Sequence, residues 1–149
     1  GAWDDEMIIP ASPPIEVGND WYFYYTGFGA NHAAGLPRNA LIGAATLPKG
    51  RIASIGTAGT VRLKPITTGA ADTLTVNCNA SGGSLKVELL DEQNNVIYGY
   101  SRDDCDAITT DTYSTAVTWA GRGLIASRTV KVVFVLDSAT LHACEIGAA

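Results

Sequence analysis

The stretch Trp21-Tyr22-Phe23-Tyr24-Tyr25-Thr26 decides the fold of the N-terminal part of this chain. Aromatic and β-branched side chains favour strands, so the stretch predicts a β-strand. The turn residues Gly18-Asn19-Asp20 come directly before it and predict a β-hairpin. Aromatic side chains then alternate between the two faces of the strand. Because nothing else in the N-terminal third of the sequence is bulky enough to cover both faces, we expect this strand to pack on the rest of the chain, on a second copy or on a parent protein.

Most downstream segments alternate apolar and polar residues, which is typical of strands with one buried face. These segments are residues 61–64, 74–79, 85–89, 130–136 and 141–146. Turn-forming clusters separate them, and the clearest local unit is a hairpin of residues 84–90 and 96–101. No segment predicts more than one turn of helix. The sequence therefore predicts an all-β fold: an antiparallel, jelly-roll-like β-sandwich preceded by a short β segment.

We expect a domain boundary near Gly56, with the N-terminal β segment over residues 1–55 and the β-sandwich domain over residues 56–149. Within the segment, residues 40–46 and 51–55 resemble two strands joined through Pro48-Lys49-Gly50. A piece of this size hardly buries a core of its own. It should therefore dock on the sandwich or on another subunit.

Composition excludes several function classes. The chain has 149 residues, of which 46% are hydrophobic and 17% charged, a globular composition. Its net charge of -5 argues against a nucleic-acid surface and against binding to anionic membranes. The sequence contains neither a transmembrane segment nor a signal-peptide pattern. A leading Gly1 is typical of a cloning remnant, so we expect the chain to be a piece of a longer parent.

The three cysteines Cys78, Cys105 and Cys144 lie far apart in the sequence. They form no CxxC motif and no Cys/His pattern with zinc spacing. Buried thiols that act as small hydrophobic residues are the favoured interpretation. The alternative is one disulfide and one free thiol, with the pair left open.

Two parts of the chain carry motifs of a known family. The first comprises residues 13–28, Asn31-His32, residues 41–47 and residues 50–55, and it resembles the last blade of a five-bladed β-propeller. The second comprises residues 77–106, with Ala80-Ser81-Gly82-Gly83 and Gly99-Tyr100-Ser101 among its matching motifs, and it resembles a β-sandwich that follows such a propeller. Together they resemble the C-terminal part of secreted glycoside hydrolases of families 32 and 43.

The resemblance implies a secreted, extracellular protein with a polysaccharide or oligosaccharide partner. Most of the propeller is missing from this sequence, and none of the family's catalytic carboxylates maps onto it. We therefore expect no catalysis from this chain alone, although its parent would be a glycoside hydrolase.

The densest acidic cluster is Asp103, Asp104 and Asp106, with Asp111 nearby. Such carboxylates bind Ca²⁺ when six to eight oxygen ligands converge. The alternative interpretation is a polar loop whose aspartates cap turns. The sequence lacks the glycine and the terminal glutamate of an EF-hand loop, so the turn-capping interpretation is favoured, and Ca²⁺ is the one cofactor we consider.

Aromatic rings bind sugars because a flat ring matches the apolar face of a pyranose. Tyr98 and Tyr100 flank Gly99 and would share one strand face as a two-ring platform. The remaining carbohydrate-binding candidates lie in the blade-like segment or elsewhere among the aromatic residues: Trp21, Tyr22, Tyr24, Tyr25, His32, Tyr113 and Trp119. Simple packing of these side chains is the competing interpretation.

Two classes of function follow. The first is a non-catalytic accessory module that recognises carbohydrate. The second is a structural or oligomerisation module, adhesin-like or phage-tail-like, in which the aromatic N-terminal strand joins copies of the chain, because exposed strands are usually hidden by pairing.

Overall fold

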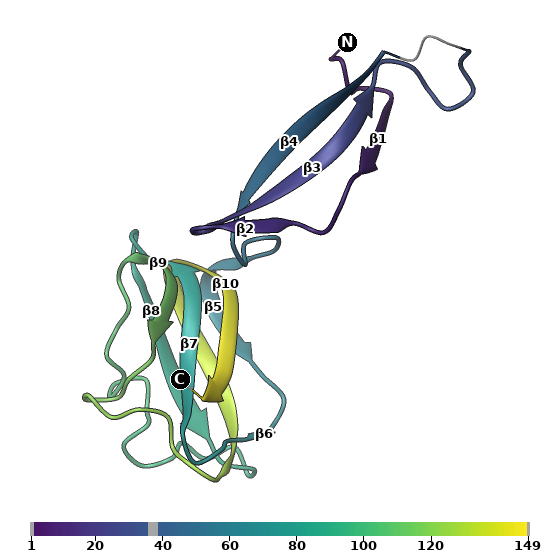
Figure 1. The fold of residues 1–149 in the computed structure, drawn as a ribbon. Coiled ribbons are helices and arrows are strands. Elements are labelled where there is room, and N and C mark those ends of the chain that lie inside the picture. Colours follow the sequence, from purple (N-terminus) through teal and green to yellow (C-terminus); the bar gives the residue numbers. More distant parts are fainter. Residues whose placement is uncertain (1, 36–38, 149) are drawn as a thin grey trace. The chain divides into compact units, whose positions relative to one another are not determined.

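The computed structural model describes residues 2–35 and 39–148. Its described residues form β-strands and no helix, so none of them could span a membrane as a helix. The chain divides into two compact units, Gly1–Lys49 and Gly50–Ala149 (Figure 1). The all-β, antiparallel prediction is confirmed.

The first unit is one four-stranded antiparallel sheet. Its strands are β1 (Met7–Pro10), β2 (Ile15–Val17), β3 (Asp20–Phe28) and β4 (Ala40–Pro48). The aromatic strand β3 is central: β4 pairs with it along one edge, while β1 and β2 share the other. The expected hairpin is present, because β2 turns into β3 through Gly18, whose φ of 61° favours glycine.

The N-terminal segment covers part of one face of this sheet. The Trp3 ring stacks on Tyr25 with 5.8 Å between centroids, and the Tyr25 hydroxyl donates to Asp4 at 2.7 Å. A Cβ at Gly27 would lie 2.3 Å from the Trp3 ring, and one at Gly43 would lie 2.5 Å from the Tyr25 ring. Only glycine at these two positions lets the rings lie flat on the sheet.

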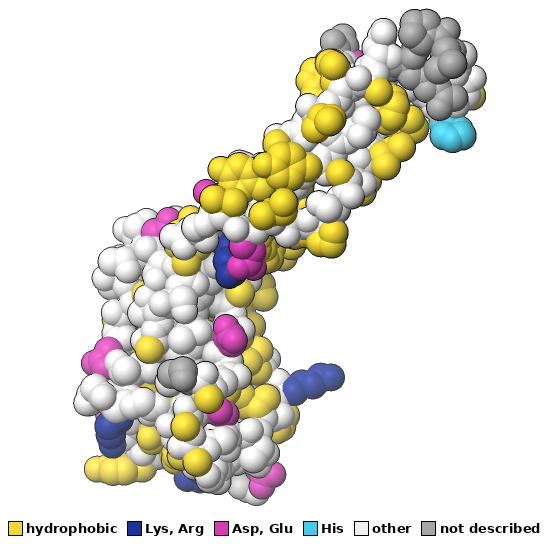
Figure 2. Space-filling model, in the orientation of Figure 1, with side chains coloured by type: hydrophobic (Ala, Val, Ile, Leu, Met, Phe, Trp, Pro, Cys, Tyr) yellow, Lys and Arg dark blue, Asp and Glu magenta, His cyan; other side chains and the backbone are white. Residues whose placement is uncertain are grey.

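The opposite face is open and apolar. Cross-strand register places Ile9 and Ile42 on either side of Thr26, with Tyr24 two residues along the same face. Ile42 is 82% exposed, Ile9 49% and Tyr24 40%. Hydrophobic side chains accordingly gather along this unit in the space-filling view (Figure 2).

The second unit is built around one long, bent strand. Its strands are β5 (Ile55–Arg62), β6 (Ile66–Thr67), β7 (Asp72–Asn79), β8 (Ser84–Leu90), β9 (Asp111–Ala116) and β10 (Thr129–Ala148). The first half of β10 pairs with β8 and β5, and the second half pairs with β7, which also pairs with β9. The register of β10 against β5 shifts at Ser138, whose φ is 47°. This bulge lets one strand serve both parts of the β-sandwich.

Alternating apolar residues enclose the core of the second unit. Leu74 and Cys78 in β7, and Val87 in β8, have no exposed surface. Trp119 is also fully buried, and its Nε1 donates to the Val87 carbonyl at 2.8 Å. Tyr100 packs on Trp119 with 5.2 Å between ring centroids. This hydrogen-bonded indole ties the loop after β9 to the sandwich.

Two local expectations are wrong. Residues 96–101 are not a strand: Val96 makes one bridge to Leu90, and Gly99 then turns the chain with φ 77°. Residues 51–54 do not pair with β4 either, and β5 begins at Ile55 and pairs with β10 instead. Alternation alone does not say which segment a strand will choose as partner.

The cysteines agree with the buried-thiol interpretation. All three are free, with Cys78 and Cys105 buried and Cys144 partly exposed. Burial raises the pKa of each thiol, because a thiolate would be poorly solvated there. The disulfide alternative is not realised in this structure.

Candidate functional site

The outer surface of β7, β9 and β10 is a polar strand face of the second unit. Since Leu74, Val76 and Cys78 point into the core, the residues between them point outward. Register places Thr75 beside Glu145 of β10. We call this surface the polar face; its residues are Arg51, Thr73, Thr75, Asn77, Asp111, Tyr113, Ser114 and Glu145.

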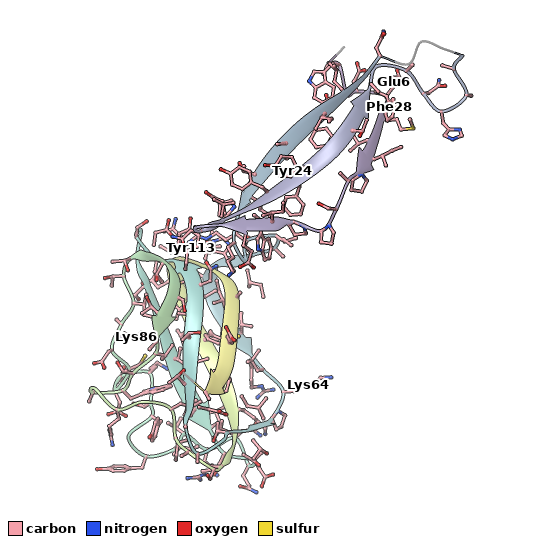
Figure 3. The ribbon with its side chains drawn as sticks, viewed as in Figure 1. Glu6, Tyr24, Phe28, Lys64, Lys86 and Tyr113 are labelled. Atoms are coloured by element: carbon pink, nitrogen blue, oxygen red, sulfur yellow. The ribbon has the colours of Figure 1, made fainter. Side chains whose placement is uncertain are left out.

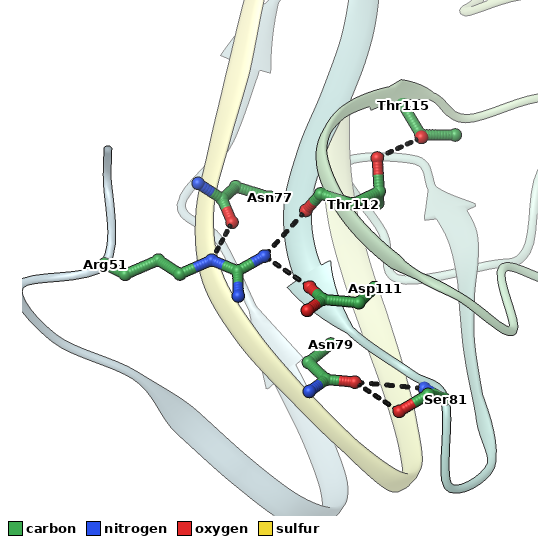
Figure 4. A network of polar contacts seen from close by, with 7 residues as sticks. All are labelled: Arg51, Asn77, Asn79, Ser81, Asp111, Thr112 and Thr115. Carbon is green, nitrogen blue, oxygen red and sulfur yellow. Dashed lines mark hydrogen bonds and ion pairs between the residues drawn. The ribbon is translucent and has the colours of Figure 1, made fainter. Parts of the chain in front are cut away.

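Arg51 organises one end of the polar face (Figure 4). Its Nε donates to Asn77 Oδ1 at 3.0 Å, and its Nη2 donates to the Asp111 carboxylate and to the Thr112 carbonyl. Gly50 brings the chain to this position: its φ is 74°, and a Cβ there would lie 2.9 Å from the Asn77 amide nitrogen. The Arg51 side chain is only 12% exposed, so these contacts hold it in one orientation.

The guanidinium of Arg51 also covers the Tyr113 ring, with its Cζ 4.4 Å from the ring centroid. Tyr113 stays 37% exposed, and Figure 3 places it at the end of the second unit where β9 begins. A cation at this distance is attracted to the ring face. The Tyr113 ring is therefore exposed to solvent, and the Arg51 guanidinium holds it in place.

Charge pairing fixes the ionisation state of this cluster. The hydrogen bond from Arg51 lowers the pKa of Asp111, and the same bond raises the pKa of Arg51. Both groups are consequently charged at neutral pH. Asp111 remains about half exposed, so this carboxylate is available as a hydrogen-bond acceptor.

A shallow groove continues the polar face. It has a volume of about 210 Å³ and is lined by Thr73, Thr75, Ser114, Glu145, Gly147 and Ala148. Three hydroxyl groups and one carboxylate therefore meet in one groove. Hydroxyls both donate and accept hydrogen bonds, while the carboxylate accepts them. Such a lining suits a ligand that carries many hydroxyl groups.

The structure does not join Tyr98 and Tyr100 into one platform. Tyr98 is 97% exposed, whereas Tyr100 packs on Trp119 and has Arg122 5.7 Å from its ring centroid. The turn at Gly99 separates the two environments. Tyr98 alone of this pair stands in solvent.

The acidic cluster is used largely for turns. Asp104 accepts hydrogen bonds from the Ser101 amide and hydroxyl, and Asp106 accepts from the Thr118 hydroxyl and the Gly121 amide. These bonds lower the pKa of both carboxyls. Asp103 is exposed, and in the described part of the chain no three His, Cys, Asp or Glu side chains come together as a metal site.

The remaining candidates lie in the first unit. Trp21 donates to Glu16 at 3.1 Å, Tyr24 stands on the open apolar face, and His32 lies exposed in the loop between β3 and β4. They are not part of the polar face. Figure 3 shows Tyr24 on the sheet of its own unit.

Sequence reasoning missed most of the polar face. Asp111 and Tyr113 were visible as an acidic residue and an aromatic residue, but Arg51 and Asn77 carried no motif. The outward positions of the alternating segment 74–79 were the available signal, because Thr75 and Asn77 had to face away from the core.

Comparison with protein-family models, with curated proteins and with solved structures finds no match to this chain. The resemblance to secreted glycoside hydrolases therefore stays a prediction from the sequence motifs.

Proposed function

We propose that this chain is a non-catalytic carbohydrate-recognition module, accessory to a secreted glycoside hydrolase, and that the polar face is its binding surface. The observation that carries the proposal is the groove of hydroxyl and carboxylate groups next to the Arg51–Tyr113 pair. Sugars offer hydroxyls for hydrogen bonding and C–H faces for contact with an aromatic ring. The extracellular location and the parent enzyme rest on the sequence resemblance.

The fixed geometry of the cluster favours binding. Arg51 already has three protein acceptors and Tyr113 already has a packed neighbour. A ligand that meets pre-ordered side chains loses less free energy to ordering them. The groove is shallow and small, so we expect it to contact one or two sugar units of a longer chain.

The charge state of Asp111 argues against a role as the acid of glycoside hydrolysis. Glycoside hydrolysis needs a carboxylic acid that is protonated before it donates to the leaving group. Asp111 has a lowered pKa because Arg51 donates to it, so it is ionised at neutral pH. Asp111 therefore supports the proposal as a hydrogen-bond acceptor rather than as an acid.

A glycan array tests this function, with the chain and two variants applied at equal concentration. Binding to one glycan class should be lost in Tyr113→Ala and kept in Tyr98→Ala, because only Tyr113 belongs to the polar face. Loss of binding in Tyr98→Ala alone would move the site to the 91–101 loop. If the folded, unmutated chain binds no glycan, carbohydrate recognition is rejected.

A second function, structural assembly, is favoured by a different observation. The open face of the first unit exposes Ile9, Tyr24 and Ile42, and among the described strands β4 pairs only with β3. Exposed apolar sheet faces and open edges are typical of interaction surfaces. In this proposal a second copy of the chain covers the aromatic sheet, and the molar mass in solution measured by light scattering tests it.

A further inference from the structure

A basic pocket lies on the second unit, apart from the residues of the polar face. Its volume is about 300 Å³, and it is lined by Arg62, Leu63, Lys64, Pro65, Asn94 and Lys131. Three of the ten Lys and Arg residues of this net-acidic chain therefore line one pocket, and its lining contains no carboxylate. Figure 3 places Lys64 on the loop between β5 and β6.

The strands fix two of the three cations. Arg62 ends β5 and Lys131 lies near the start of β10, and both point outward because Val61, Val130 and Val132 face the core. Register places Arg62 beside Val133, two residues from Lys131 on the same face. The β-sheet thus holds two positive side chains as near neighbours, and Lys64 joins them from the loop.

The side-chain oxygen of Asn94 lies between two of the cations, where an anion would bind. Its Oδ1 accepts from Lys131 Nζ at 2.8 Å and from Arg62 Nη1 at 3.4 Å. The φ of Asn94 is 70°, a conformation that asparagine tolerates and that brings its amide over the sheet. Lys131 Nζ also donates to the Glu92 carbonyl at 2.7 Å. Only neutral oxygens therefore meet these two cations, and they leave the positive charges uncompensated.

The acidic side chain on the neighbouring strand β8 is already neutralised by another cation. Glu88 lies opposite Val133 on the neighbouring strand, and it forms a two-pronged ion pair with Arg102 at 3.1 and 3.2 Å. No carboxylate in the described part of the chain lies within salt-bridge distance of Arg62, Lys64 or Lys131. The pocket is positive because its own charges have not been paired within the fold.

We propose that the basic pocket binds an oxyanion carried by an acidic polysaccharide, namely a uronate carboxylate or a sulfate ester. Arginine and lysine donate charge-assisted hydrogen bonds to such groups. The assignment to a sugar rests on the proposed carbohydrate recognition, whereas the anion chemistry follows from the pocket itself. The ligand class of this module is then anionic rather than neutral glycan.

Titrations followed by two-dimensional amide NMR test the proposal with four probes: trigalacturonate, galactose 6-sulfate, neutral galactotriose and inorganic sulfate. The acidic sugars should shift the amide signals of residues 62–64, 94 and 131. Arg62→Gln and Lys64→Gln change exposed side chains, and each should weaken binding about three- to tenfold, the effect of removing one charged donor near the surface. Lys86→Gln on β8 is the matched control and should leave affinity unchanged.

The outcomes test the basic pocket and the polar face separately. Pocket shifts by the acidic sugars that are reduced in both variants support the inference. Shifts by inorganic sulfate alone would reduce the pocket to a free-anion site and overturn the assignment to a sugar. Acidic sugars that bind equally well to the Arg62→Gln and Lys64→Gln variants would overturn the pocket itself. Failure of the polar face is seen separately, as an absence of shifts at Thr75, Tyr113, Ser114 and Glu145 while the pocket signals still respond to the acidic sugars.

Discussion

The guanidinium of Arg51 lies 4.4 Å from the centre of the Tyr113 ring while it also bonds Asn77, Asp111 and Thr112. One side chain thereby ties the segment after the first unit to β7 and β9. The same contacts orient an exposed aromatic ring and an ionised carboxylate beside a groove of hydroxyls. In the proposed function, structural anchoring and ligand recognition would depend on the same residue.

Replacing Arg51 with lysine should lower the free energy of unfolding by about 1–2 kcal/mol. Lysine keeps the charge, but its single ammonium cannot make the separate bonds to Asn77 and Asp111. Urea denaturation followed by tryptophan fluorescence measures the change. Arg128→Lys, at an exposed position, is the control. If Arg51→Lys is as stable as the unmutated chain, the contacts of Arg51 do not anchor the segment after the first unit.

Replacing Trp119 with phenylalanine should lower the free energy of unfolding by about 2–4 kcal/mol. The change removes part of a fully buried side chain and leaves the Val87 carbonyl without the indole donor that now lies 2.8 Å away. Tyr98→Phe should stay within about 0.5 kcal/mol, because Tyr98 is almost wholly exposed. Chemical denaturation followed by far-UV circular dichroism compares the two. A loss below about 1 kcal/mol for Trp119→Phe would contradict this description of the core.

Stability should fall between pH 7.5 and pH 5.5 because of His142. Burial, and secondarily the charge of Arg51, lower the pKa of His142, whose Nδ1 is buried without a hydrogen-bond partner in the described structure. Near pH 6.5 the His142 side chain therefore binds a proton in the unfolded chain but not in the folded chain. The contribution of neutral His142 to the free energy of unfolding is fully present above that pH and decreases as the pH falls below it.

The His142→Gln variant isolates this effect, and its urea midpoint should change less than that of the parent chain over the same pH range. Asp111 has a lowered pKa and removes stability only below its unfolded value of about 4, so the two effects do not overlap. Parallel pH dependence in the variant and the parent would rule out His142 as the titrating group.

Replacing Ile42 with aspartate should dissociate any assembly made through the open face of the first unit. Ile42 is 82% exposed, so the change should barely alter the stability of the folded chain. Light scattering should show the mass falling toward the 15.6 kDa of one chain. Val96→Asp, at an exposed aliphatic position of the second unit, is the matched control and should leave the mass unchanged. If the unmutated chain is already monomeric at high concentration, the proposed structural function is rejected.

Much of the fold could be predicted from alternation, and the failures have physical causes. Leu74, Val76 and Cys78 alternate with polar residues, so β7 and its buried face were readable from the sequence. Segment 130–136 and segment 141–146 were predicted as separate strands, but the bulge at Ser138 lets both belong to β10. The strand β9 was missed because its Asp-Thr-Tyr-Ser-Thr-Ala sequence lacks apolar alternation.

The candidate site was less predictable because its contacts are long-range. Arg51 and Asp111 meet across a separation of 60 residues. Their meeting depends on the turn at Gly50 and on the pairing of β9 with β7, neither of which a local pattern specifies. Tyr98 and Tyr100 show the converse: their spacing suggested a shared face, and the turn at Gly99 placed them apart.

Carbohydrate binding by the polar face is the proposed function of this chain. The most direct measurement is an amide NMR titration of the isotope-labelled chain with the best glycan from the array. We predict that the largest shifts fall on Thr75, Tyr113, Ser114 and Glu145, and that Tyr113→Ala removes them while the rest of the spectrum stays folded. Shifts confined to other surfaces, with these four signals unmoved at saturation, would contradict the claim.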